Sequence, residues 1–401
     1  MSEDIRTSLA PDCGAETRFL DPSASYLVLA DRIWAEPGRV LAPGWLLVRG
    51  GRVADSGSGP FPQTDRVSCL DLRGFDLTPG LIDVHVHLDL DPGSGAGLEA
   101  RIEGAAISGL AAVRDGGSAG GRILASRERV ERRLRLRAAG PALFAPGRYG
   151  RFIGRPVANR DEMASTVEEL AGAGADLVKV LASGPVALDA FGRVGPPQFS
   201  RSDLVFLAAL ARERGLPLMA HANGPEAVTH CIAAGVDSIE HGYFMGDEAL
   251  RRLAASDTVW VPTIEPMAAL GRIEAERPPR AHLIERTVRH QVEQLARARQ
   301  LGVRLATGTD AGAPGVEFGP GLRSELAWWF QAGLDHQEVL AAATFQAAEL
   351  LGLADDLGRL TQGAMAFLIG YDRARPLDRA LTRPPDLVIR PGAPGPVRRV
   401  P

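Results

Sequence analysis

The chain has 401 residues, of which 45% are hydrophobic and 23% charged, and its formal net charge is −4. This length allows a large core, and the balance of charge argues against a partner that is a nucleic acid or an anionic membrane. Its three cysteines are too far apart for a CxxC motif or a disulfide framework. No apolar run reaches membrane-spanning length and no signal-peptide pattern is present, so we expect a cytoplasmic protein.

Lysine is nearly absent from this sequence. Among 45 lysine and arginine residues, only Lys179 is lysine. Arginine supplies the positive charge everywhere else, and its guanidinium stays protonated. The single lysine should therefore do what arginine cannot, which is to lose its proton and act as an amine.

Short β-like runs separated by glycine-containing turns occupy residues 26–77, and the chain returns to the same pattern after residue 357. Such runs are typical of a small antiparallel β unit. We expect the two segments to pair. The prediction is a small β-sandwich domain built from both ends of the chain, over residues 1–78 and 358–401.

Between these segments, over residues 79–357, short apolar runs alternate with helical stretches, which is typical of a parallel sheet covered by helices. The runs are 81–87, 111–115, 142–146, 176–182, 217–222, 238–242, 259–263 and 304–310. Eight strands, each followed by a helix, predict an α/β fold of the (β/α)8 or TIM-barrel class. The segment 264–282 resembles a long loop, either a cover over a substrate or a surface excursion.

Four histidines and one aspartate fall at the ends of the expected strands. His85 and His87 are two positions apart on the first strand, so both side chains point to the same side. His221, His241 and Asp310 end the fifth, sixth and eighth strands. Active sites of this fold lie at the carboxyl ends of the strands, where imidazoles and a carboxylate can bind a metal such as zinc.

Lys179 belongs to the C-terminal part of the fourth strand, at the same end of the expected barrel. Metal cations nearby would favour its neutral amine over the protonated form. A neutral amine can add carbon dioxide and become a carbamate, whose two oxygens can bridge two metals. Arginine cannot form this group, which explains why one lysine remains.

Four segments together resemble the amidohydrolase superfamily: TPGLIDVHVHL, GADLVKVLASG, MAHANG followed by IAAGVDSIEHG, and LATGTDAG. The resemblance is to its imidazolonepropionase-like and Xaa-Pro or Xaa-Arg dipeptidase-like branch, and it implies two divalent metal ions. His85, His87 and Asp310 would bind the first. His221 and His241 would bind the second, and a carboxylated Lys179 would bridge both.

The resemblance also implies a metal-dependent hydrolase that cleaves an amide-type C–N bond in a small molecule such as a dipeptide or an N-acyl amino acid. A hydroxide between the two metals, zinc by default, would be the nucleophile, and Asp310 would take its proton and pass it to the leaving group. The expected substrate contacts are Arg148, Tyr149 and Asn223. Asn223 stands where relatives often have tyrosine, which departs from a standard dipeptidase. We also expect a homo-oligomer.

Three other interpretations stay open at this stage. A mononuclear enzyme of the imidazolonepropionase or deaminase type would act on a cyclic C–N bond, but such relatives lack the bridging lysine. A lactone or ester hydrolase would use the same site. A barrel without catalysis, serving as a scaffold, would need a lost ligand, and none of the expected ligands is missing.

Overall fold

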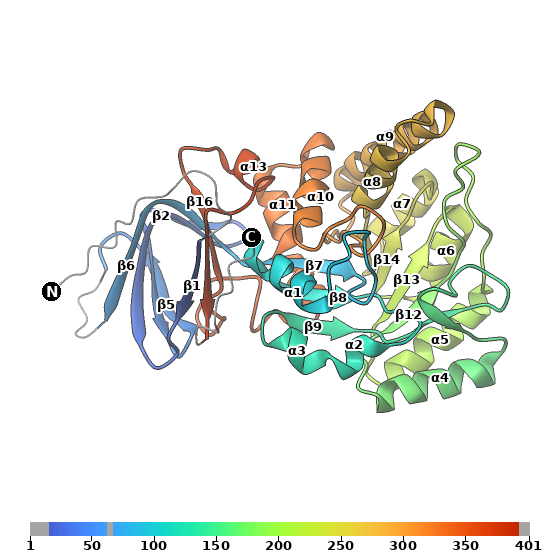
Figure 1. The fold of residues 1–401 in the computed structure, drawn as a ribbon, viewed down its shortest axis with the longest axis horizontal. Coiled ribbons are helices and arrows are strands. Elements are labelled where there is room, and N and C mark those ends of the chain that lie inside the picture. Colours follow the sequence, from blue (N-terminus) through green and yellow to red (C-terminus); the bar gives the residue numbers. More distant parts are fainter. Residues whose placement is uncertain (1–15, 62–66, 393–401) are drawn as a thin grey trace.

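The computed structural model describes residues 16–61 and 67–392. A twisted β-sheet unit lies at one end of the molecule, and a larger region of helices and parallel strands lies beside it (Figure 1). Strands from the first fifth of the chain and from its last part meet in the smaller unit. The candidate site lies in the larger region.

The smaller unit is one eight-stranded sheet with the order β1-β17-β16-β6-β2-β4-β5, in which β3 pairs with β2. β16 pairs with β6 in antiparallel fashion, and β17 pairs with β1 in parallel, so the sheet needs both ends of the described chain. The strands are β1 (Glu16–Leu20), β2 (Ser25–Glu36), β3 (Arg39–Leu41), β4 (Gly44–Arg49), β5 (Arg52–Ser58), β6 (Ser68–Pro79), β16 (Leu368–Asp372) and β17 (Leu387–Pro391).

The inner face of this sheet is apolar because every second residue of its strands is large and hydrophobic. Val28 and Ala30 of β2, and Leu46 and Val48 of β4, are buried in one cluster with Leu368 of β16. This pairing agrees with the expected contact between the two chain ends. The limits 1–78, 79–357 and 358–401 stay predictions, and 1–15 and 393–401 lie outside the described residues.

The larger region contains two parallel sheets. One has the order β7-β8-β9 and the other the order β11-β10-β12-β13-β14-β15. The strands are β7 (Leu81–Val86), β8 (Leu110–Asp115), β9 (Arg135–Ala138), β10 (Ala142–Phe144), β11 (Gly154–Pro156), β12 (Val178–Leu181), β13 (Leu218–Ala222), β14 (Ser238–His241) and β15 (Val259–Val261). Most of their residues are buried, as expected for parallel strands covered by helices on their outer face.

The segment 304–311 connects an edge of one parallel sheet to an edge of the other. Leu305 forms a parallel bridge with Trp260 of β15, and Ala311 forms one with Val86 of β7. The backbone N–H of Val84 also donates to the carbonyl of Thr307. The carboxyl ends of β7, β14 and β15 are thereby brought together around this segment. The strand expected over 304–310 is present only as these bridges.

The third strand differs from the sequence-based prediction. The run 142–146 contains β10, but β10 pairs with β12 through Leu143 and Val180 and not with β8. The second neighbour of β8, beside β7, is instead β9 (RLRA), whose two arginines set it apart from the apolar runs. Only Leu136 and Ala138 of β9 are buried, while its two arginines are partly exposed, so a search for continuous apolar runs passes over this strand.

Helices cover the outer faces of the parallel strands (Figure 1). They are α1 (Leu98–Ile107), α2 (Arg122–Ala125), α3 (Arg127–Glu131), α4 (Arg160–Gly172), α5 (Arg201–Glu213), α6 (Pro225–Ala234), α7 (Gly246–Ala254), α8 (Glu265–Ile273), α9 (Pro278–Leu301), α10 (Pro320–Gln331), α11 (His336–Ala343), α12 (Phe345–Leu350) and α13 (Leu377–Ala380). Their ends follow local chemistry. Asn159 caps α4, Ser200 caps α5, and Gly302 ends α9 with φ 73°.

The segment 264–282 is helical and not the loop that the sequence predicted. It forms α8 and the first turn of α9. α8 begins at a buried carboxylate contact, because the backbone N–H of Glu265 donates to Glu325 Oε2 of α10 at 2.8 Å. Among the described residues, no helix combines the length and the apolar character needed to span a bilayer.

Candidate metal centre

His85 and His87 lie on the same side of β7, as the alternation along a strand requires. Both are buried. His87 Nδ1 donates to the carbonyl of Gly117 at 2.6 Å, which leaves Nε2 facing Asp310 Oδ1 at 3.1 Å. His85 Nε2 lies 3.5 Å from the same oxygen. Two imidazoles and one carboxylate therefore meet at the end of β7.

Asp310 reaches these histidines because its neighbours are small. A side chain at Gly308 would place its Cβ 2.7 Å from the Cβ of His85, and one at Gly312 would lie 2.6 Å from the carbonyl oxygen of His87. The backbone N–H of Asp310 donates to the carbonyl of His85 at 2.7 Å. Asp310 itself has φ 55°, a backbone region that non-glycine residues rarely occupy.

His221 and His241 come from the ends of β13 and β14. Their ring centroids are 4.5 Å apart, and the ring of His241 lies 5.0 Å from that of His85. His241 Nδ1 lies 2.7 Å from the hydroxyl of Thr263, which leaves Nε2 free. His241 and Thr263 both have positive φ, 69° and 43°. Local backbone strain of this kind is concentrated at functional sites.

Lys179 is 1% exposed and extends from β12 into the same group. Its Nζ lies 3.5 Å from His85 Nε2. Burial lowers the pKa of Lys179 to about 8, although Glu240 and Asp310 act in the opposite direction. About a tenth of the amine is therefore neutral at pH 7, far more than for a lysine in water. The structure thus places the amine of Lys179 beside His85, and its role as a ligand stays a prediction.

The protonation states suit metal binding. Burial lowers the pKa of His85 to about 4 and that of His221 to about 3, and it places the pKa of His241 well below its usual value. These imidazoles are neutral at pH 7 and offer lone pairs. For Asp310, burial raises the pKa, but the interactions with His85 and His87, including the hydrogen bond from His87, and the nearby Lys179 outweigh it, so the pKa is lowered.

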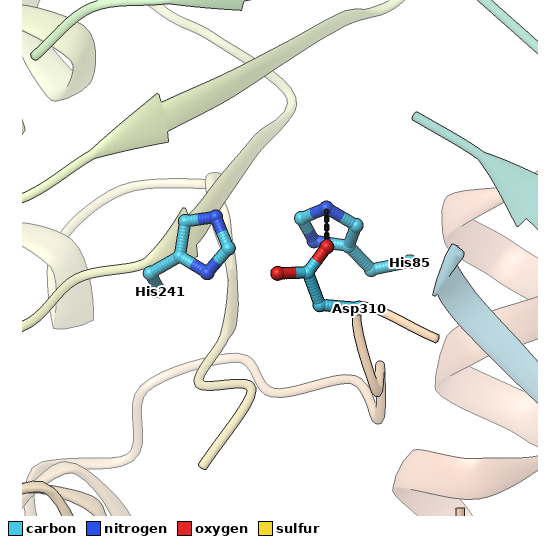
Figure 2. A group of neighbouring side chains, drawn as sticks. All are labelled: His85, His241 and Asp310. Atoms are coloured by element: carbon cyan, nitrogen blue, oxygen red, sulfur yellow. Dashed lines mark ion pairs between the residues drawn. The ribbon is translucent and has the colours of Figure 1, made fainter. Parts of the chain in front are cut away.

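Figure 2 shows His85, His241 and Asp310 pointing toward one another, with the ion pair between His85 and Asp310 dashed. One donor atom from each of the three residues lies within 4.8 Å of the other two. Neutral imidazoles and a carboxylate at this spacing are a donor set that zinc and similar divalent ions accept. The residues present therefore fit a metal ion.

A buried charged network behind His85 was missed by the sequence analysis. Glu240 Oε2 lies 2.8 Å from His85 Nδ1, and Glu240 Oε1 accepts a hydrogen bond from Arg114 Nη2 at 2.8 Å. Ser238 Oγ donates to the same oxygen at 2.5 Å. Burial alone would raise the pKa of Glu240. Arg114 and His85 together have the larger effect and lower this pKa to about 2, so the group is a carboxylate. The signal in the sequence was an arginine and a glutamate, each within an apolar strand.

Asp83 is a second residue that the sequence analysis missed, although it shares a strand face with His85 and His87. Its Oδ1 accepts from the backbone N–H groups of His85 and Thr309, and its Oδ2 accepts from the Thr309 hydroxyl at 2.6 Å. Burial raises the pKa of Asp83 to about 7. This carboxyl group ties the strand of the histidines to the segment that carries Asp310.

The three expected substrate contacts differ in their surroundings. Arg148 is exposed. The ring of Tyr149 lies 5.5 Å from that of His221, and burial raises its pKa, so the phenol keeps its proton. Asn223 is buried, and its side chain already contacts the carbonyl of Gly184 and accepts from the backbone N–H of Tyr243. The substrate roles of these residues stay predictions.

Comparison with known proteins places this geometry in a family. The sequence model of the Amidohydrolase family matches residues 77–385. An uncharacterized protein of Mycobacterium tuberculosis is 29% identical over 343 residues, covering 82% of this chain and 89% of its own length. An imidazolonepropionase of Paracoccus denitrificans is 28% identical over 392 residues, covering 84% of this chain and 90% of that protein.

Solved structures agree on the fold. A Xaa-Pro dipeptidase with bound methionine superposes with a TM-score of 0.79 at 24% identity, covering 92% of this chain and 98% of that one. A putative prolidase from Bifidobacterium longum gives 0.79 at 25% identity, covering 94% and 97%. The α/β region is thus of the TIM-barrel-like type. The chain belongs to the amidohydrolase family, in its imidazolonepropionase-like and dipeptidase-like branch, and is a hydrolytic enzyme.

Proposed function

We propose that the chain is a metal-dependent hydrolase that cleaves an amide-type C–N bond of a small molecule, a dipeptide or an N-acyl amino acid. The observation that carries the proposal is the meeting of His85, His241 and Asp310, with donor atoms within 4.8 Å of one another, beside the buried amine of Lys179. The relatives named imidazolonepropionase and Xaa-Pro dipeptidase support the C–N class.

In this proposal the site holds two divalent metals, with zinc as the default ion. The first would be held by His85, His87 and Asp310, and the second by His221 and His241. A Lys179 carboxylated by carbon dioxide would hold both, because a carbamate has two oxygens. Bound divalent ions lower the pKa of water and polarise a carbonyl group, which is the chemistry that such a site supplies.

The protein's own groups supply proton transfer and positioning. Asp310 is a carboxylate with its side chain 20% exposed, so it can accept a proton from water and deliver it to a leaving amine. Tyr149 keeps its phenolic proton and lies against His221, where it can donate a hydrogen bond to a substrate oxygen. In this proposal the exposed Arg148, next to Tyr149 in the chain, attracts a substrate carboxylate, and Asn223 is the third contact.

The proposal also includes a closed (β/α)8 barrel, a small β-sandwich, and the domain limits 1–78, 79–357 and 358–401. The bridges of segment 304–311 to β15 and β7 support closure on one side. We further propose a cytoplasmic homo-oligomer with a small-molecule substrate. Light scattering on the purified protein tests the oligomeric state directly.

A second function is favoured by one observation. Among the described residues, His85, His241 and Asp310 form one group whose donor atoms all lie within 4.8 Å of one another, which would suit one metal ion. A mononuclear enzyme acting on a cyclic C–N bond, as the name imidazolonepropionase indicates for the relative, would use such a group. A lactone or ester hydrolase would use the same residues. Lys179 favours the binuclear proposal, because a bridging carbamate has no role beside a single ion.

The test combines metal counting with a substrate screen. The enzyme is loaded with zinc in the presence of bicarbonate, dialysed, and analysed for metal per chain. It is then assayed with dipeptides, N-acyl amino acids, cyclic amides and lactones. Two ions per chain and cleavage of linear amides are expected. One ion with cleavage of cyclic amides alone would replace the proposal with the mononuclear one, and absence of metal binding would refute both.

A further inference from the structure

A β-hairpin over residues 183–198 follows β12, the strand that carries Lys179. Its two arms are joined by antiparallel bridges between Ser183 and Pro197 and between Val186 and Val194. At its base, Gln198 Nε2 donates to the carbonyl of Tyr149 at 2.9 Å and to that of Ser183 at 3.0 Å. The hairpin is thus a paired and anchored structure and not an irregular loop.

The neck of the hairpin requires glycine on both arms. A Cβ added at Gly195 would lie 2.5 Å from the Cα of Gly184, and one added at Gly184 would lie 2.8 Å from the Cα of Gly195. The atoms that would clash are backbone atoms, which cannot move aside without shifting an arm. The position of the Gly184 carbonyl therefore depends on Gly195.

That carbonyl contacts a proposed metal ligand. His221 Nε2 lies 3.3 Å from the oxygen of Gly184, and the side-chain amide of Asn223 lies 3.4 Å from it. The same Nε2 lies 3.3 Å from Asn223 Nδ2, so the Gly184 carbonyl and the Asn223 amide together hold this edge of the imidazole in place. Asn223 is held in turn, because its backbone N–H donates to the hydroxyl of Ser183 at 2.8 Å.

The tip of the hairpin is held by contacts of Phe191 with the loop after β14 and with α9. The ring of Phe191 lies 5.2 Å from that of Phe244, in the loop after β14, and 6.1 Å from that of His290 on α9. The guanidinium of Arg286 lies 4.1 Å above the same ring. Phe244 has φ 56°, one of four positive-φ non-glycine residues described, and the other three are His241, Thr263 and Asp310. Backbone strain in a bulky residue at this place favours a functional role for the contact.

We propose that the hairpin 183–198 is a positioning element for His221, fixed at its neck by Gly184 and Gly195 and at its tip by Phe191. Through the carbonyl of Gly184 it orients the imidazole toward the metal centre. This inference rests on the proposed metal site and adds residues that do not themselves bind metal. It predicts that damage to the hairpin weakens the His221 side of the site selectively.

The test uses binding of cobalt(II), whose absorption spectrum reports its coordination, in the full-length protein. The two variants are Gly195→Ala and Phe191→Ala. Gly172→Ala is the matched control for the first, because a Cβ there meets no atom within 4 Å. Val205→Ala on α5 is the control for the second, since both side chains are exposed large hydrophobics. Phe191→Tyr, which keeps a stacking ring, should restore wild-type behaviour.

In the wild type we expect two equivalents of cobalt. In Gly195→Ala the weaker equivalent should lose affinity by about 10-fold or more, with an altered spectrum, while the tighter one stays within about 2-fold. Phe191→Ala should show the same change to a smaller extent, and because its side chain is exposed it tests the inference even if Gly195→Ala does not fold.

Unchanged cobalt affinity and spectrum in both variants, with two equivalents bound by the wild type, would overturn the inference and leave the proposed function standing. If the wild type binds one equivalent, the inference holds only if the variants weaken that equivalent selectively against their controls. A wild type that binds no cobalt would refute the proposed metal site, and the inference with it.

Discussion

The carboxylate of Glu240 stands directly behind the imidazole of His85, with Oε2 2.8 Å from Nδ1. The two residues come from β14 and β7, so the contact spans the interior of the α/β region. Arg114, 3% exposed, holds the other oxygen of the carboxylate. A negative charge at Nδ1 increases the electron density at Nε2, the nitrogen that faces the site.

We expect Glu240→Gln to lower metal affinity by about 10- to 100-fold, because the imidazole loses its charged partner while the shape of the side chain is kept. Competition with a chromophoric chelator measures the change. Ser238→Ala is the matched control, since Ser238 belongs to the same network without touching His85. Equal losses in the two variants would show that the network matters only for packing.

Lys179→Arg should lose both metal and activity, because a guanidinium cannot form a carbamate and its permanent charge would repel cations. Lys179→Ala should also be inactive but should regain partial activity with short carboxylic acids, which can replace the carbamate in the space left behind. Metal analysis and initial rates with added acetate or propionate test this. Full activity in Lys179→Arg would contradict the carbamate.

Removing metal should lower thermal stability, because ions that bind the folded state alone stabilise it. At a free metal concentration of about 100 times the dissociation constant, the effect is about 2.7 kcal/mol for one ion. The melting temperature before and after dialysis against a chelator measures it. An unchanged melting temperature after proven metal loss would show that the histidines and Asp310 are already held in place by their hydrogen bonds.

Glu325 should make stability fall as pH rises. Burial raises its pKa to about 8, since hydrogen bonds from the backbones of Glu265 and Ile264 and from Trp329 only partly offset the loss of water. The folded state therefore retains a proton that the unfolded chain loses above its ordinary pKa near 4.5. The destabilising effect grows from that pH up to about pH 8 and is constant above it.

The melting temperature of the wild type, followed from pH 5.5 to 8, should thus fall more steeply than that of Glu325→Gln, which carries no titrating proton. The expected difference between the two is on the order of 2 °C or more over this range. Glu338→Gln, at an exposed carboxylate of the capping box on α11, is a suitable control. Parallel curves for wild type and Glu325→Gln would show that this carboxyl is not protonated in the folded state.

The sequence was most informative where a local rule sets the geometry. Alternation along β7 predicted that His85 and His87 share a face, and the composition singled out Lys179, which the structure places beside His85. Local rules could not choose β9 over β10 as the neighbour of β8. β9 is a short strand in which arginines alternate with buried residues, and only its pairing with β8 reveals it.

Contacts between elements far apart in the chain could not be predicted from the sequence either. The first N–H of helix α8, that of Glu265, donates to Glu325, which lies sixty residues further along the chain. No pattern within 264–282 predicts this contact. Likewise, Glu240 and His241 both face the site because His241 has φ 69°, which breaks the alternation of β14. Positive φ at a histidine follows from tertiary packing, so residue type alone does not reveal it.

The pairing of β6 with β16 places Pro79 opposite Leu368. Nearly the whole catalytic region lies between these two partners in the chain, so the small sheet closes only after a very long stretch of polypeptide has been arranged. Until then β6 presents an open row of N–H and C=O groups to any other extended chain. Assembly of this sheet is consequently the step at which a folding molecule is most exposed to pairing with the wrong neighbour.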